Sequence, residues 1–277
     1  MDAESVLGYL LARQKPTGGF GLTLRLPPSL EDTYYAFRSL ELLEATANVN
    51  RLGDYLAGVP VSAASPVKVL FQQAYLRRWA DGSLEGIEAA VRIRLSRRPD
   101  LAELYWALRV ARELGGAPKE RLSAAVWEAS APRLASWRTV TDMWQLLVLR
   151  EFRRLRAPEG ALAWALSCQN LDGGFGFLPG TTSFLENTIY GLRVVAHLGG
   201  APRWPERCGE YVLRCRSGRG GYGRASEALP SPETTYMALA SLRLLDQMQA
   251  GPEVRAHLPP ESHSPSVEEP RWKPTHS

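Results

Sequence analysis

The chain has 277 residues, of which 45% are apolar and 22% charged, a balance typical of a soluble globular protein with a large core. Its net charge of +4 is small and its cations are scattered, so nothing in the charge calls for nucleic acid as a partner. The three cysteines form no close pair, and no uncharged apolar run approaches the roughly 18 residues that cross a membrane. The N-terminus also lacks a cationic secretory signal, so we expect a cytoplasmic protein without a disulfide framework or a transmembrane segment.

The first fifty residues predict a helical hairpin with a glycine-rich turn. Residues 4–14, ESVLGYLLARQ, have helical character, and Gly18-Gly-Phe-Gly21 follows them. A second helix is predicted from about residue 30, because apolar side chains then recur at the i, i+4, i+8 spacing of one helix face. Ser29 and Asp32 have the Ser-x-x-acid spacing of a capping box at its start.

The middle of the chain, residues 50–155, lacks the glycine signature but keeps the pattern of the second helix. Residues 101–118 align without gaps on residues 185–202, and both segments end in Leu-Gly-Gly-Ala-Pro. Looser copies begin near residues 66 and 139. First helices are predicted near residues 50–58, 85–96 and 120–130.

The glycine loop recurs twice more, at Gly173–Gly176 and Gly220–Gly223. Each copy is followed by nine residues, a glutamate and, two residues later, a threonine, which gives the unit G-G-[FY]-G-x9-E-x-T. Ser183 and Glu186 repeat the spacing of a capping box. A single glycine loop suggests phosphate binding, but this one recurs in every complete hairpin and lacks the Lys and Ser/Thr of a phosphate loop. We interpret it as structural, supplying positive φ angles and close passage of the backbone.

Six hairpins result, with second helices starting near residues 30, 66, 101, 139, 185 and 232. Such a stack forms either an open superhelix or a closed ring. The last hairpin has the same apolar pattern as the first, and neither end has a polar capping variant, which favours a closed all-α ring over residues 1–249. Residues 250–277 contain six prolines and three loosely spaced histidines, and they predict a disordered tail without a metal site.

The repeat resembles the one shared by protein prenyltransferase β subunits and squalene–hopene cyclases. The best copies are RQKPTGGFG followed by LEDTYYAF, and CQNLDGGFG followed by LENTIYGL. The resemblance implies an (α/α)6 toroid whose inner helices surround a funnel for an isoprenoid chain. Aromatic residues near the starts of the second helices would line that funnel or pack the core between the two rings: Tyr34, Tyr35, Tyr105, Trp106, Trp144, Tyr190 and Tyr236.

The chemistry of that family is not carried by matching residues. The transferases bind zinc through an Asp-x-Cys at the start of one inner helix and a histidine at another, and no equivalent position here has the cysteine or the histidine. The cyclases use an Asp-x-Asp-Asp acid, and no two aspartates here lie within four residues of each other. We therefore expect no metal or other cofactor, apart from Mg²⁺ if a diphosphate is bound.

Single residues remain as site candidates. Asp32 and Asp142 stand at helix starts, where each is either an acid or magnesium ligand or a helix cap. Arg97 and Arg138 stand in loops before second helices, where guanidinium groups could hold a diphosphate.

Two functions follow from the sequence. The first is a prenyltransferase-like enzyme, or else a terpene cyclase, acting on an isoprenoid. The second is a catalytically degenerate toroid that binds a hydrophobic ligand or a protein partner. A requirement for a helical partner subunit, as in the eukaryotic transferases, is a further alternative.

Overall fold

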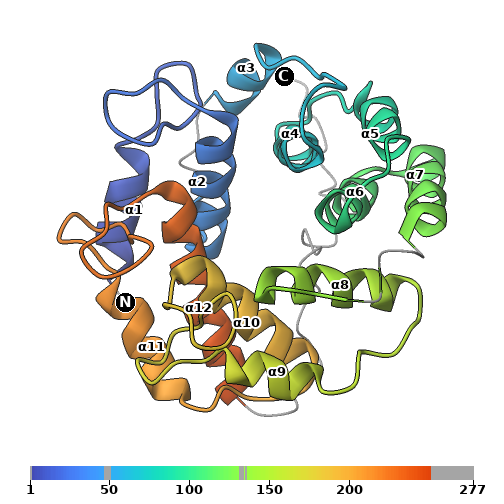
Figure 1. Ribbon diagram of the computed structural model, residues 1–277. Helices are drawn as coiled ribbons and strands as arrows, with labels where there is room; N and C mark the ends of the chain where they lie inside the picture. Colours follow the sequence, from blue (N-terminus) through green and yellow to red (C-terminus); the bar gives the residue numbers. More distant parts are fainter. Residues whose placement is uncertain (1, 47–50, 131–133, 135, 251–277) are drawn as a thin grey trace.

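The computed structural model describes residues 2–46, 51–130, 134 and 136–250, and every regular element within them is a helix. The helices form six successive hairpins, each made of an outer and an inner helix (Figure 1). The outer helices are α1 (Ala3–Leu11), α3 (Leu52–Ala57), α5 (Ile87–Leu95), α7 (Gly116–Ser130), α9 (Ala161–Ser167) and α11 (Pro205–Arg214). The inner helices are α2 (Leu30–Leu42), α4 (Val67–Trp79), α6 (Leu101–Glu113), α8 (Val140–Phe152), α10 (Leu185–His197) and α12 (Pro232–Gln249).

The inner helices form a closed ring. Each of them packs against the next one in chain order, and α12 packs against α2 (Figure 1). The predicted toroid and its closure are therefore confirmed, and the inner helices start within one residue of the predicted positions. The predicted tail lies outside the described residues from residue 251 onward.

Side-chain caps fix the starts of several inner helices. The Ser29 hydroxyl accepts a hydrogen bond from the backbone N–H of Asp32 at 3.0 Å, which is one half of the predicted capping box; the other half is absent, because the Ser29 N–H donates to the Phe20 carbonyl at 3.1 Å. Thr139 and Asp142 form a complete capping box at the start of α8. The predicted box of Ser183 and Glu186 is wrong, because α10 starts one residue later, after Phe184. The Ser183 hydroxyl instead donates to the Asp172 carboxylate at 2.9 Å.

The threonine of each repeat holds the glycine loop in place. The hydroxyl oxygen of Thr188 accepts the backbone N–H of Phe175 at 3.1 Å, and Thr33 and Thr235 make the same bond to the aromatic residues of their own loops. All three threonines are fully buried. Because the acceptor is buried, the bond costs more to remove than a surface bond would. The constant spacing between glycine and threonine is thus explained by one buried hydrogen bond, which each of the three repeats forms.

The glycines are needed where each loop meets the outer helix of the following hairpin. Gly18, Gly173 and Gly220 have φ angles of 101°, 94° and 95°, which favour glycine. A Cβ on Gly220 would lie 2.3 Å from the carbonyl oxygen of Ser5 in α1, and a Cβ on Gly221 would lie 2.4 Å from the Tyr9 ring. The outer helix therefore contributes two contact residues four positions apart, which we call its docking pair.

The docking pairs occupy the same position relative to the buried face of their helices. They are Ser5/Tyr9 on α1, Arg51/Tyr55 beside and on α3, and Arg207/Tyr211 on α11. Each pair directly precedes two buried residues on its helix, respectively Val6/Leu10, Leu52/Leu56 and Cys208/Val212. The loop of the last hairpin docks on the first helix, where Arg216 also forms a 2.9 Å ion pair with Asp2. The same contact that joins neighbouring hairpins thus closes the ring.

Candidate functional site

The six inner helices present their residues to the ring axis in a common register. Counted from the first residue of each helix, the second, fifth and ninth positions form three successive levels. The second positions include Glu31, Lys68, Glu186 and Glu233, which we call the charged level. The fifth positions form the aromatic level, which consists of the rings Tyr34, Phe71, Tyr105, Trp144 and Tyr236 together with the aliphatic Ile189. Three of the ninth positions form the arginine level, Arg38, Arg109 and Arg193.

The charged level is held by ion pairs between hairpins. The Lys68 Nζ lies 2.6 Å from Glu31 and 3.8 Å from Glu233, so one lysine links α4 with α2 and α12. Glu186 is paired with Arg224 of the last glycine loop. Burial raises the pKa of Glu233, although the nearby Lys68 opposes that rise.

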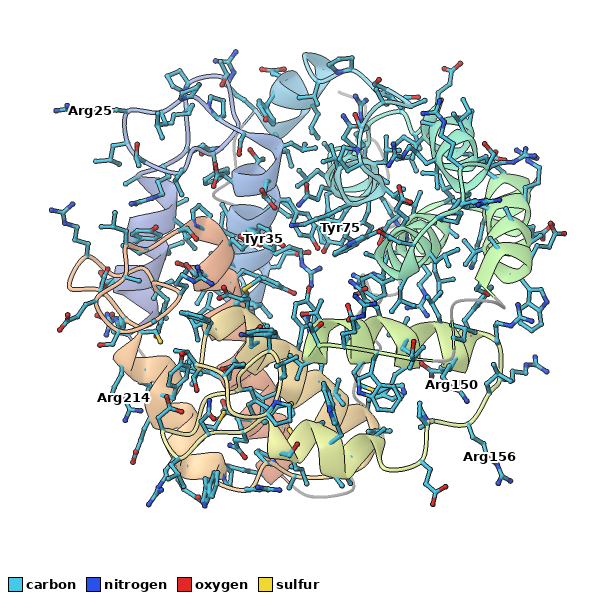
Figure 2. The ribbon with its side chains drawn as sticks, in the orientation of Figure 1. Arg25, Tyr35, Tyr75, Arg150, Arg156 and Arg214 are labelled. Atoms are coloured by element: carbon cyan, nitrogen blue, oxygen red, sulfur yellow. The ribbon has the colours of Figure 1, made fainter. Side chains whose placement is uncertain are left out.

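Ring contacts join the members of the aromatic level to each other and to Trp106, and they include one edge-to-face pair and one tilted pair. The Tyr34 ring lies 5.7 Å from Phe71, and the Phe71 ring lies 5.2 Å from Trp106. The Trp144 indole N–H donates to the Tyr105 hydroxyl at 3.2 Å. Burial raises the pKa of Tyr34 to about 12, so that its hydroxyl is neutral at physiological pH. Figure 2 shows Tyr35 and Tyr75 on the inner side of the ring, while Arg25 and Arg156 point away from it.

The arginine level lies one helical turn further along the axis and is bound to the aromatic level. Arg38 donates to the Tyr34 hydroxyl at 3.3 Å, and Arg109 donates to the Tyr105 hydroxyl at 3.0 Å. Arg193 donates across helices to the Tyr236 hydroxyl at 3.4 Å. The three arginines come from α2, α6 and α10, that is, from every second inner helix. This arrangement places positive charge around the axis behind a wall of rings.

Two carboxylates accompany these arginines, the partly buried Glu41 and the buried Glu113. Glu41 lies 2.9 Å from Arg38 and accepts the Tyr75 hydroxyl at 2.7 Å, while Glu113 lies 3.6 Å from Arg78. Burial raises the pKa of both glutamates, and the nearby arginines limit the rise.

The axis contains a cavity of about 20 Å³. Its lining includes Arg109 and Arg193 together with Tyr34, Tyr35, Tyr105, Trp106, Tyr190 and Tyr236. Six of the seven predicted aromatic residues therefore face this cavity. The seventh, Trp144, is buried outside the lining, where it donates to the Tyr105 hydroxyl and lies beneath the Arg193 guanidinium. A cavity of this size has room for about one water molecule.

The structure places the predicted acids in helix caps. Asp32 accepts the Ser29 hydroxyl at 2.6 Å, and Asp142 accepts the backbone N–H groups of Arg138 and Thr139 at 3.0 and 3.1 Å. Neither aspartate lines the axial cavity. Burial raises the pKa of Asp32, with the Ser29 hydrogen bond opposing it.

The arginines proposed from sequence are not the ones at the axis. Arg97 and Arg138 are exposed, and neither lines the cavity. Sequence reasoning missed Arg38, Arg109 and Arg193 instead. The sequence did contain a signal for these arginines. When the inner helices are aligned from their first residues, all three arginines occupy the ninth position.

Neither a cluster of metal ligands nor a membrane-spanning helix is present in the part of the chain that the structure describes. Among residues 2–46, 51–130, 134 and 136–250, no group of three or more His, Cys, Asp and Glu is placed to hold a metal ion. In the same part of the chain, no helix has both the length and the apolar character needed to cross a bilayer.

Comparison with known proteins agrees with the observed architecture. A family model, described as the prenyltransferase alpha-alpha toroid domain, matches residues 1–63 and 139–259, which is more than half of the chain. The comparison with curated proteins gave no match. The part between the two matched segments contains α4 to α7, which belong to the three hairpins that lack the glycine loop.

Proposed function

Because the chain belongs to the prenyltransferase alpha-alpha toroid family, we propose that it binds an isoprenoid-type anion along the ring axis, as a binding protein rather than a transferase. The observation that carries this proposal is the lining of the axial cavity, where six aromatic side chains meet the guanidinium groups of Arg109 and Arg193. Aromatic rings suit a hydrocarbon chain, and guanidinium groups bind phosphate oxygens through paired hydrogen bonds.

The axial cavity is too small for an isoprenoid, so binding requires side chains to move. Sites for ligands of this size measure about 300–1,000 Å³, far more than the about 20 Å³ present on the axis. An isoprenoid therefore enters only if some rings move. Trp106 and Tyr190 line the cavity while keeping part of their surface exposed, so these two side chains are the ones we expect to swing aside.

The position of the acids favours binding over turnover. Asp32 and Asp142 both hold backbone or hydroxyl groups at helix starts and are separate from the cavity lining. A carboxylate engaged in a cap is poorly placed to protonate or activate a ligand in the ring.

Isothermal titration with farnesyl diphosphate, farnesol and inorganic diphosphate tests the proposal. We expect farnesyl diphosphate to bind more tightly than either fragment and to be recovered unchanged by mass spectrometry. Arg193→Gln should weaken its binding about 10–100-fold, because one charge-assisted hydrogen bond contributes about 1.5–3 kcal/mol. Arg97→Gln, at an exposed arginine away from the cavity, is the matched control and should bind normally. Equal affinity of the Arg193 and Arg97 variants would refute axial binding.

The second candidate is an enzyme acting on the same ligand, and one observation favours it. Burial raises the pKa of Asp32, and a raised carboxyl pKa is the direction of shift that a general acid requires. In that case inorganic diphosphate or a new hydrocarbon is released during incubation, and Asp32→Asn abolishes the release while farnesyl diphosphate still binds.

A further inference from the structure

The ring has six places where a loop can meet the outer helix of the next hairpin, and they are filled in different ways. Glycine loops fill the places on α1, α3 and α11. On α9, Trp164 packs against Trp137 of the preceding loop with ring centroids 5.8 Å apart. On α7, Arg121 forms an ion pair with Glu88 of α5 at 2.5 Å.

The place on α5 has a different form. In the other docking pairs, each docking residue directly precedes a buried residue of its helix. The buried residues of α5 are Ile87 and Val91, so its docking pair is Gly86/Ala90. Alanine thus stands where the other three docking pairs have tyrosine. The preceding loop, residues 58–66, has no glycine motif. Its nearest approach to Gly86 is Val61, whose Cγ1 lies 3.8 Å from where a Cβ would be.

A shallow groove, largely open to solvent and with a volume of about 440 Å³, lies at this place between the loop and α5. In Figure 1, α5 stands beside the chain that joins α3 to α4. Val61 and Ala63 line the groove on the loop side, and the docking pair lines it on the helix side. Ala89 and Ile93 complete an apolar surface, and Ile93 keeps 45% of its surface exposed. The acidic residue of the lining is the exposed Glu85.

We propose that this groove binds a short segment of a protein partner that carries a bulky apolar side chain next to a lysine or arginine. The structure itself shows what fits such a place, because loop segments occupy it on three other outer helices. In those cases the helix supplies the tyrosine ring and the loop supplies glycine. On α5 the helix supplies no ring: Ala90 is small and only 5% exposed, while Gly86 and Ile93 are exposed, so an incoming segment can place a ring over Gly86 and Ile93.

The negative charge of Glu85 accounts for the lysine or arginine in the proposed segment. Glu85 stands at the edge of an otherwise apolar lining, where a basic side chain of the partner can pair with it. This surface belongs to the outer ring and does not include the axial cavity, so the inference is independent of the proposed function.

A double-mutant cycle with a peptide tests the inference on the full chain. The probe is a labelled synthetic peptide of residues 169–178, QNLDGGFGFL, changed by Gly174→Tyr to move the ring onto the segment and by Asp172→Lys to face Glu85. A second peptide keeps Gly174 and carries only the Asp172→Lys change. Binding is measured by fluorescence anisotropy.

We expect the Gly174→Tyr peptide to bind the unmodified protein at least tenfold more tightly than the Gly174 peptide does. Ala90→Tyr in the protein should reverse this preference, because the helix then supplies the ring. Ala163→Tyr on the exposed surface of α9 is the matched control and should leave the preference unchanged. If Ala90→Tyr fails to fold, Ile93→Lys at an exposed groove residue should weaken the Gly174→Tyr peptide at least tenfold.

Three results would overturn the inference. The first is that the peptide fails to bind, or binds the unmodified protein and the groove variants equally. The second is that a synthetic peptide of residues 251–277 displaces the probe, which would assign the groove to this chain's own terminal segment. The third is that Ala90→Tyr changes the sedimentation coefficient from that of an oligomer to that of a monomer, which would assign the groove to a second copy.

Discussion

Replacing Gly220 by alanine tests whether the glycine loop closes the ring by close approach. The substitution places a Cβ at a φ angle of 95°, which costs about 1–2 kcal/mol for a residue with a side chain. The Cβ would also lie 2.3 Å from the Ser5 carbonyl oxygen, so that either the loop or α1 must shift. Forcing an extra methyl group into a packed contact costs about 1–3 kcal/mol more.

Gly180→Ala is the matched control. Gly180 also has a positive φ angle, 79°, but a Cβ there would meet nothing within 4 Å. The control therefore contains the backbone cost alone, and the difference between the two variants isolates the close approach. For a chain of this size, about 1 kcal/mol shifts the Tm by about 2–4 °C. We expect Gly220→Ala to unfold about 2–12 °C below Gly180→Ala in differential scanning calorimetry.

The position of the damage is a second readout. Gly220→Ala should speed amide hydrogen exchange in α1, whereas Gly173→Ala, with the same kind of contact, should speed exchange in α11. Equal Tm values for Gly220→Ala and Gly180→Ala would refute the reasoning, and so would exchange that rises uniformly over the ring.

Three further predictions concern the buried polar groups. Thr188→Val removes the acceptor of the Phe175 N–H, and should lower the free energy of unfolding by about 1–3 kcal/mol in urea denaturation, while Thr188→Ser should retain most of it. Asp142→Ala should cost about 1 kcal/mol in the same assay through loss of its capping box, and an unchanged midpoint would contradict the assignment of Asp142 as a cap. Burial raises the pKa of Glu41, Glu113, Glu233 and Asp32, so the folded chain holds protons more tightly than the unfolded chain, and the free energy of unfolding should rise as the pH falls from 7 through these raised values. Glu113→Gln should flatten that rise, and stability that instead falls over this range would show that other groups dominate.

The repeat allowed most of the fold to be predicted. A glycine loop, a glutamate and a threonine at fixed spacing mark one local structure. The three copies therefore identified their hairpins from sequence, and they located the starts of α10 and α12 to within one residue. The capping box at Ser183 failed because two other groups compete for that hydroxyl. It accepts from Asn170 at 2.9 Å and donates to Asp172, both in the preceding loop, and a local pattern does not record such contacts.

The candidate site was predicted less completely, because its lining depends on which side chains of the six inner helices point toward the ring axis. The aromatic residues at the helix starts could be named, since aromatic side chains are conspicuous there. Which of many arginines reach the axis depends on how six helices turn their faces inward, and Arg38, Arg109 and Arg193 do so from the same position. The cavity volume depends on how the rings pack against each other, and periodicity carries no information about that.

The contact between Ser5 and Gly220 has a consequence for how the protein is made. The two residues lie near opposite ends of the described chain, and the ion pair between Asp2 and Arg216 spans 214 positions. During translation, α1 emerges before the other five hairpins but meets its loop only when the sixth hairpin has left the ribosome. A nascent chain of five hairpins therefore leaves the loop-facing side of Tyr9 uncovered, and we expect chaperones to recognise that side until the sixth hairpin has been made.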